Sequence, residues 1–267
     1  CMPLYAYFLA FFYKLPGLDL DLIVRLIQGL LGAGVSVFLY LIGRALWNRT
    51  IGVIAAGVSC FYAIGIFYDG VLVPASLAAF LTVFSLYLLV NIRATQPLHF
   101  KKLFFTGLVL GMSVLAHSAA LPVLIFLFFW LWFGGCVVRE KRFAATGVLY
   151  AGVLIVLFFP FVRNYIVAKD IVPFTSHAGI NFYIGAHEQS QGKFSLPFGQ
   201  GAGPREVFRY SQEMADKQTG KKLKPSEVSS YWFKKGLSFI TFHPFKYGQL
   251  LFKKVFADKG YDADFFH

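Results

Sequence analysis

The sequence contains few charged residues. Only 14% of its 267 residues are Asp, Glu, Lys or Arg, and 57% are hydrophobic. Soluble domains average about 25% charged and roughly 45–50% apolar residues. Because so little polar side chain is available to cover a water-exposed surface, the composition predicts an integral membrane protein.

Motifs of soluble enzymes are also missing. The three cysteines, Cys1, Cys60 and Cys136, lack metal-ligand or redox spacing, so they predict neither a zinc site nor a disulfide framework. No Ser–His–Asp order, HExxH or CxxC pattern occurs. We therefore predict no required cofactor and no dedicated metal site, and the sequence leaves use of a divalent metal open.

The net charge of +12 does not indicate nucleic-acid binding. The first basic residues are spread over three short loops, and neither a glycine-rich phosphate loop nor a nucleic-acid module occurs. We expect membrane lipids as partners and no nucleic acid.

Long apolar runs fill the first part of the chain, and a membrane-crossing helix needs about 20 apolar residues. Residues 19–165 are predicted to form an all-α polytopic bundle, after an interfacial external helix in the aromatic stretch 1–18. We predict six spans, at about 20–43, 51–68, 71–92, 103–116, 119–138 and 143–163.

Basic residues alternate between the predicted loops. They follow the first, third and fifth spans: Arg44 and Arg49; Arg93, Lys101 and Lys102; Arg139, Lys141 and Arg142. The loops at 68–70 and 117–120 contain no Lys or Arg. Since cytoplasmic loops collect these residues, we expect the basic loops on the cytoplasmic side of a membrane and everything after Tyr165 on its outer side.

Residues 166–267 carry most of the acidic residues, and we predict an external, mostly helical domain. It would begin with a glycine-rich loop over 179–203, followed by helices at about 204–218, 226–242 and 244–256. The last helix mixes Phe with Lys, which suits either a helix on an anionic membrane surface or an amphipathic helix packed on its own domain.

Asp69 is the one charged residue between Ile51 and Ile92. It has two interpretations: an N-cap for a helix starting near Val71, or an acid at the outer rim that binds or activates a polar substrate. Gly70 would form a tight turn, and Pro74 would lie near the next helix start.

Other polar residues near the predicted outer face also have a structural interpretation beside a functional one. Arg163, with Asn164 and Tyr165, is either an interfacial anchor or a ligand for lipid phosphate. Arg25 is predicted to pair with Asp21 at i,i+4. His117 fits a hydrogen-bonded rim residue better than a catalyst.

Five stretches, taken in order, resemble a known family. They are "MPLYAYFLAFFYKLPG" (2–17), "VRLIQGLLGAGVSVFLYLIGRALW" (24–47), "FYDGVLVPASLAAFL" (67–81), "FVRNYIVAKDIVPFTSHAGINFYIGAH" (161–187) and "PSEVSSYWFKKGLSFITFHPFKYGQLLFKK" (225–254). The chain resembles the bacterial family-39-type glycosyltransferases, relatives of protein mannosyltransferases and lipid A aminoarabinose transferases with the GT-C fold.

The resemblance implies transfer of a hexose or pentose from a polyprenyl-phosphate donor to a protein, lipid or glycan acceptor outside the inner membrane. It implies Asp69 as an accessory acid and a donor-phosphate site at Arg163, Asn164 and Tyr165. It also implies a lid or substrate loop with Asn181, Tyr183 and Gly185. His117 and Arg25 remain candidate rim residues by their positions near the ends of their spans.

The resemblance also marks what this sequence lacks. The family's main catalytic acid lies in the first external loop, which we expect upstream of Cys1, so we expect an incomplete chain that is inactive alone. Relatives usually continue beyond a point like His267, so we also expect the external domain to be truncated at its end. Relatives often carry Glu at the Asp69 position and Arg where this chain has His117-Ser118. The alternative functions are a polytopic transporter or flippase, a surface-polysaccharide polymerase or ligase, and a non-catalytic scaffold.

Overall fold

The structure is a computed structural model that describes residues 3–13, 19–94, 99–133, 139–170, 177–188, 190 and 204–256. Every regular element in these ranges is a helix, as the sequence predicts. The chain divides into two compact units, Cys1–Arg163 (unit 1) and Asn164–His267 (unit 2), which are described separately.

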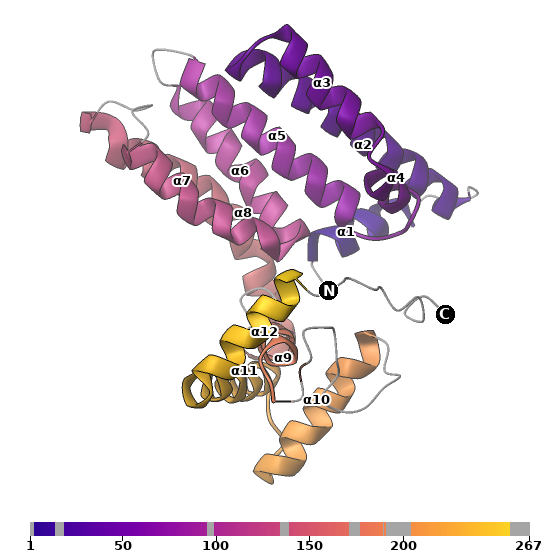
Figure 1. The fold of residues 1–267 in the computed structure, drawn as a ribbon, viewed down its shortest axis with the longest axis vertical. Coiled ribbons are helices and arrows are strands. Elements are labelled where there is room, and N and C mark those ends of the chain that lie inside the picture. The colour runs from indigo at the N-terminus through magenta and orange to yellow at the C-terminus, as the bar shows by residue number, and fades with distance from the viewer. Residues whose placement is uncertain are drawn as a thin grey trace. The chain divides into compact units, whose positions relative to one another are not determined.

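Unit 1 is a helical bundle in which α5 packs against both α2 and α6, and α3 packs against α2 (Figure 1). Its elements are α1 (Pro3–Phe12), α2 (Leu20–Leu46), α3 (Arg49–Cys60), α4 (Ala63–Asp69), α5 (Ala75–Ala94), α6 (Phe100–Ala116), η1 (Ser118–Ala120), α7 (Leu121–Phe133), η2 (Arg139–Lys141) and α8 (Arg142–Ala168), whose last five residues belong to unit 2.

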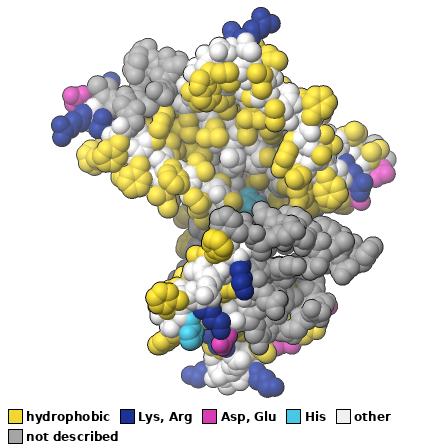
Figure 2. Space-filling view, in the orientation of Figure 1, with side chains coloured by type: hydrophobic (Ala, Val, Ile, Leu, Met, Phe, Trp, Pro, Cys, Tyr) yellow, Lys and Arg dark blue, Asp and Glu magenta, His cyan; other side chains and the backbone are white. Residues whose placement is uncertain are grey.

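Three helical segments of the described chain are long and apolar enough to cross a membrane: Leu20–Leu46, Ala75–Ile92 and Arg139–Val167. A fourth crossing is formed if α3 and α4 act as one broken span, while α1 and Ser118–Phe133 are shorter apolar helices. Large hydrophobic side chains cover much of unit 1's displayed surface (Figure 2). These features are those of an α-helical membrane protein.

The predicted span at 51–68 is not one straight helix. The helix axis bends by 57° between α3 and α4. At the break Tyr62 is extended, and its N–H donates to the Ser59 carbonyl at 3.2 Å. The run Ser59 to Tyr62 contains only residues of modest helix propensity, so little opposes the break.

The next predicted span also starts later than expected. α5 begins at Ala75, not Val71, because Pro74 has no N–H to donate and suits the first turn of a helix. The Pro74 carbonyl accepts the Ala78 N–H at 2.9 Å. Residues 71–74 therefore form a connection beside α4.

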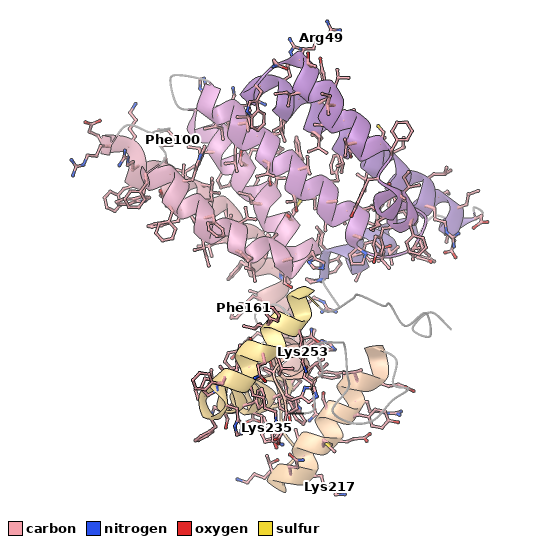
Figure 3. All side chains as sticks on the ribbon, viewed as in Figure 1. Arg49, Phe100, Phe161, Lys217, Lys235 and Lys253 are labelled. Atoms are coloured by element: carbon pink, nitrogen blue, oxygen red, sulfur yellow. The ribbon has the colours of Figure 1, made fainter. Side chains whose placement is uncertain are left out.

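The basic loops share one end of unit 1. The facing ends of α2 and α3, of α5 and α6, and of α7 and α8 lie at that end, where Arg49 and Phe100 are labelled, and Phe161 lies toward the other end (Figure 3). This arrangement is compatible with the alternation of basic loops, and the number of spans stays a prediction. It places no side of the bundle in a particular compartment.

Glycines let the helices of unit 1 approach closely, as small residues commonly do in membrane helices. A Cβ added at Gly107 would stand 2.1 Å from the backbone carbonyl oxygen of Leu149 in α8. A Cβ added at Gly52 would stand 2.6 Å from the backbone carbonyl oxygen of Tyr40 in α2. Backbone atoms fill these positions, so the glycines fix the α6–α8 and α2–α3 crossings.

Unit 2 contains α9 (Ala178–Gly185), α10 (Pro204–Thr219), α11 (Pro225–Phe242) and α12 (Pro244–Phe256). The last three match the helices that the sequence predicts. The sequence predicts a loop over 179–203, but residues 179–185 belong to α9, a helix that packs on α11. Residues 189 and 191–203 lie outside the described residues. Gly179 permits this packing, because its Cβ would lie 1.8 Å from the Ser229 oxygen.

Buried side chains hold unit 2 together. The Trp232 ring lies in the core, and its Nε1 donates to the Ser211 carbonyl at 3.1 Å. The buried Asp170 carboxylate accepts from the Ser226 N–H at 2.8 Å and from the Ser226 hydroxyl at 2.6 Å. Asp170 thereby caps the first turn of α11.

Candidate functional site

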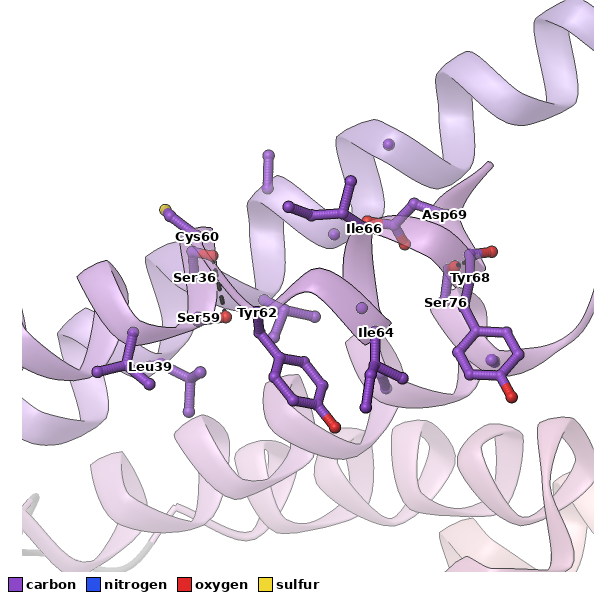
Figure 4. A pocket seen from close by; sticks show the side chains of 18 of the residues that line it. Ser36, Leu39, Ser59, Cys60, Tyr62, Ile64, Ile66, Tyr68, Asp69 and Ser76 are labelled. Atoms are coloured by element: carbon purple, nitrogen blue, oxygen red, sulfur yellow. Dashed lines mark hydrogen bonds between the residues drawn. The ribbon is translucent and has the colours of Figure 1, made fainter. Parts of the chain in front are cut away.

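A cavity of about 860 Å³ lies in unit 1 between α2, α3, α4 and α5 (Figure 4). Most of its lining is apolar or glycine. Its polar side chains, which come from all four helices, are Ser36, Ser59, Tyr62, Tyr68, Asp69 and Ser76. Asp69 is the only acidic or basic side chain among the described residues that line it.

Asp69 is the last residue of α4, so the N-cap interpretation is wrong. The next helix starts six residues later, at Ala75. The C-terminal end of a helix carries a partial negative charge and disfavours a carboxylate. Gly70 closes α4 with φ −82°, a conformation open to any residue, so the predicted glycine turn is not needed either.

The Asp69 carboxylate lies directly against the backbone of α2. A Cβ built on Gly32 would stand 2.0 Å from Asp69 Oδ2 and 3.0 Å from Oδ1. Within the described part of the chain, Asp69 makes no hydrogen bond or ion pair, and it is half-buried. A carboxylate whose oxygens make no hydrogen bond within the protein can accept a proton or a hydrogen bond from a ligand.

The cavity opens on the apolar surface of unit 1. Its lining residues Val58, Tyr62 and Ile66 are each more than half exposed and belong to α3, α4 and their junction. The bend between α3 and α4 lies at this wall. A ligand with an apolar tail and a polar end fits such a lining, because the tail meets aliphatic side chains and the polar end meets Asp69.

The connection after Asp69 is held by Gln28, a fully buried residue of α2. Gln28 Nε2 donates to the Val71 carbonyl at 2.8 Å and to the Tyr68 carbonyl at 3.4 Å. Its Oε1 accepts the Tyr5 hydroxyl of α1 at 3.0 Å. The Ser76 hydroxyl adds a hydrogen bond to the same Tyr68 carbonyl at 3.3 Å.

Sequence reasoning missed Gln28. The available signal was an uncharged polar side chain inside a long apolar run, which in membrane helices commonly bonds across a helix interface. Ser36 and Ser59 are likewise uncharged polar residues within apolar runs. The Ser36 hydroxyl donates to the Ser59 hydroxyl oxygen at 3.1 Å and links α2 to α3 at the cavity wall (Figure 4).

The predicted rim residues have local roles. His117 ends α6, and its Nδ1 accepts the Ala119 N–H at 3.2 Å, in line with a hydrogen-bonded rim residue. The expected pair between Arg25 and Asp21 is absent from the described residues. Asp21 instead accepts the Tyr13 hydroxyl at 2.9 Å, which brings α1's end to α2's start.

The residues predicted to bind phosphate are adjacent in α8. Arg163 and Tyr165 are exposed and Asn164 is half-buried. Arg163 is not among the residues that line the Asp69 cavity. The structure therefore describes a cavity with one carboxylate and, separately, a short polar segment near the end of α8.

The residues predicted to form a lid belong to α9 in unit 2, so a loop lid is wrong for this segment. Tyr183 packs on Trp232 with ring centroids 4.9 Å apart, Asn181 is exposed, and Gly185 ends the helix. The packed aromatic pair and the buried Gly179 make this helix part of the core of unit 2.

The described residues contain no group of three or more His, Cys, Asp or Glu side chains that could hold a metal ion. Comparisons of the chain with protein-family models, with curated proteins and with solved structures find no match. The evidence for function is therefore the cavity, its single carboxylate and the apolar helices around it.

Proposed function

We propose that the chain is part of a membrane glycosyltransferase with a GT-C-like bundle of six spans. It would move a sugar from a polyprenyl-phosphate donor to an acceptor at the outer face of a bacterial inner membrane. The observation that carries this proposal is the Asp69 carboxylate, which has no hydrogen-bond or ion-pair partner among the described residues and lines an apolar cavity that opens on the apolar surface of the bundle.

The lining of the cavity favours an acceptor role for Asp69. No basic side chain among the described residues lines the cavity, so a phosphate there would meet a carboxylate with no counter-charge. A hydroxyl or amine acceptor would instead donate to the Asp69 oxygens, which orients it and can take up its proton.

Arg163 is the group that we assign to the donor phosphate, because a guanidinium binds phosphate oxygens in pairs and stabilises charge on a leaving phosphate. Asn164 and Tyr165 would add hydrogen bonds. The resemblance of "FVRNY" to the glycosyltransferase family supports this assignment, as does the exposure of Arg163 at the end of the last apolar span.

Asp69→Asn tests the acceptor role in the full-length protein reconstituted with a radiolabelled polyprenyl-phosphate sugar and its acceptor. The amide keeps the shape of the side chain and loses its charge, so transfer should fall by about 10²-fold while folding is retained. Unchanged transfer would leave Asp69 as a wall residue and remove the basis of the proposal.

A transporter or lipid flippase is the second candidate, and the broken pair α3–α4 favours it. Interrupted helices line the binding sites of many transporters, and the 57° break lies at the wall of this cavity. Movement of a solute or labelled lipid in proteoliposomes, without sugar transfer, would select this alternative.

A further inference from the structure

The turn between α11 and α12 exposes two large aromatic side chains. Phe242 is 78% exposed and Phe245 is 90% exposed, on either side of His243-Pro244. Phe252 is also exposed and lies seven residues after Phe245, on the same face of α12. Exposed apolar surface of this size on a polar domain marks a surface that meets a partner.

Basic residues outnumber acidic ones around this corner. Residues 228–256 contain five Lys and no Asp or Glu. Lys246 donates to Glu188 at 3.1 Å, and that hydrogen bond lowers the pKa of the Glu188 carboxyl, so the pair stays ionised at neutral pH. Lys234 and Lys253 are exposed and have no hydrogen bond or ion pair among the described residues. The surface therefore complements an anionic partner.

The chain tethers this corner to a helix that can cross a membrane. α8 forms most of the apolar segment Arg139–Val167, which is long enough to cross a bilayer, and unit 2 begins at Asn164 within this helix. A tethered surface has a high effective concentration, so a few inserted side chains are enough to hold it. A lipid surface is therefore favoured over a diffusing protein.

We propose that the α11–α12 corner docks unit 2 on an anionic bilayer. Phe242 and Phe245 insert at the boundary of the acyl chains, and Lys234 and Lys253 contact the headgroups, as in interfacial helices. Docking depends on this surface of unit 2 alone and holds whichever activity unit 1 carries.

Depth-dependent fluorescence quenching tests the proposal on the full chain. A variant with Cys1, Cys60 and Cys136 replaced by Ser carries Phe245→Cys labelled with bimane and is reconstituted in vesicles containing nitroxide-labelled phosphatidylcholine. A matched label at Lys217→Cys, in the last turn of α10, reports a position outside the corner. With phosphatidylglycerol present, quenching at 245 should exceed that at 217 by about twofold or more.

The charge of the headgroups is tested in the same assay. Lys234→Gln with Lys253→Gln should reduce docking by about fivefold for each lysine. The matched pair Lys221→Gln with Lys222→Gln, which removes the same charge from exposed positions elsewhere, should leave quenching unchanged. Phosphatidylcholine alone should also reduce the quenching at 245.

Three results would overturn the proposal. Equal quenching at 245 and 217 means that the corner does not enter the bilayer. If quenching at 245 changes neither with phosphatidylglycerol nor with the two lysine substitutions, the corner does not recognise an anionic surface. Disulfide formation between copies through Phe245→Cys, without lipid quenching, assigns the corner to a second copy of the chain. A label at Phe242→Cys repeats the measurement from the other helix, so a local defect at position 245 cannot decide the outcome.

Discussion

A carboxylate and a glycine backbone meet at the wall of the cavity. Asp69 has room for its oxygens only because Gly32 has no side chain, and the acid has no other described partner. The position of the carboxylate is therefore set by a residue on another helix, 37 positions away in the sequence (69 − 32).

Gly32→Ala should displace the Asp69 carboxylate without removing it. The new methyl group would overlap Oδ2, which can rotate away because it ends a side chain, so the thermal midpoint should change little. Transfer should fall by about 10²-fold, since misplacement by about 1 Å is enough for such a loss. Gly57→Ala on α3 is the control, because nothing lies within 4 Å of its Cβ. If Gly32→Ala transfers sugar as fast as the unchanged protein, the position of the Asp69 carboxylate does not matter for the reaction.

Gln28 is the second residue on which the site depends. Gln28→Leu would leave the Val71 carbonyl and the Tyr5 hydroxyl without their hydrogen bonds. Because both bonds are at least partly buried, we expect a loss of about 1–3 kcal/mol in the free energy of unfolding, measured as a lower denaturation midpoint in detergent. Leu30→Ala, on the exposed face of α2, should have a much smaller effect. Equal midpoints for the two variants would show that the network contributes no stability.

At the scale of elements, the interruptions between helices shape the cavity, and the glycines allow the helices of unit 1 to pack closely. Tyr62 and Asp69, at the two ends of α4, both line the cavity, and α5 begins only after Pro74, which leaves the Val71 carbonyl free to accept from Gln28. The crossings that hold these helices depend on backbone contacts at Gly52 and Gly107.

Gly107→Ala should destabilise the α6–α8 crossing. Its methyl group would overlap the Leu149 carbonyl oxygen, and because a backbone atom cannot rotate away, the helices must separate. We expect a loss of about 1–3 kcal/mol, read from the denaturation midpoint. Gly147→Ala on α8 provides the comparison, since nothing lies within 4 Å of its Cβ and alanine favours helix. A Gly107→Ala midpoint no lower than that of Gly147→Ala would contradict this account of the crossing.

At the scale of the whole molecule, the shared end of the basic loops makes the topology testable. In a variant without native cysteines, Arg49→Cys and Lys141→Cys should react with a membrane-impermeant maleimide only after spheroplasts are opened, whereas Ala119→Cys should react before. The expectation follows from retention of Lys and Arg in the cytoplasm. Labelling of all three positions in intact spheroplasts would contradict the alternating six-span arrangement.

The sequence by itself determined the membrane class, most helix positions and the last three helices of unit 2. Composition and apolar run length report directly on the solvent around a helix, and Pro204, Pro225 and Pro244 mark helix starts. The sequence also singled out Asp69, because a lone acid in a long apolar run is conspicuous.

Only the tertiary structure decided what surrounds that acid. The approach of Gly32, the Gln28 network and the packing of Ala178–Gly185 on α11 each depend on contacts between distant residues. Local pattern cannot report such contacts, because a glycine or glutamine looks the same in sequence whether its neighbour is lipid or another backbone. The acid was visible in the sequence, whereas the cavity that gives it a role exists only in the fold.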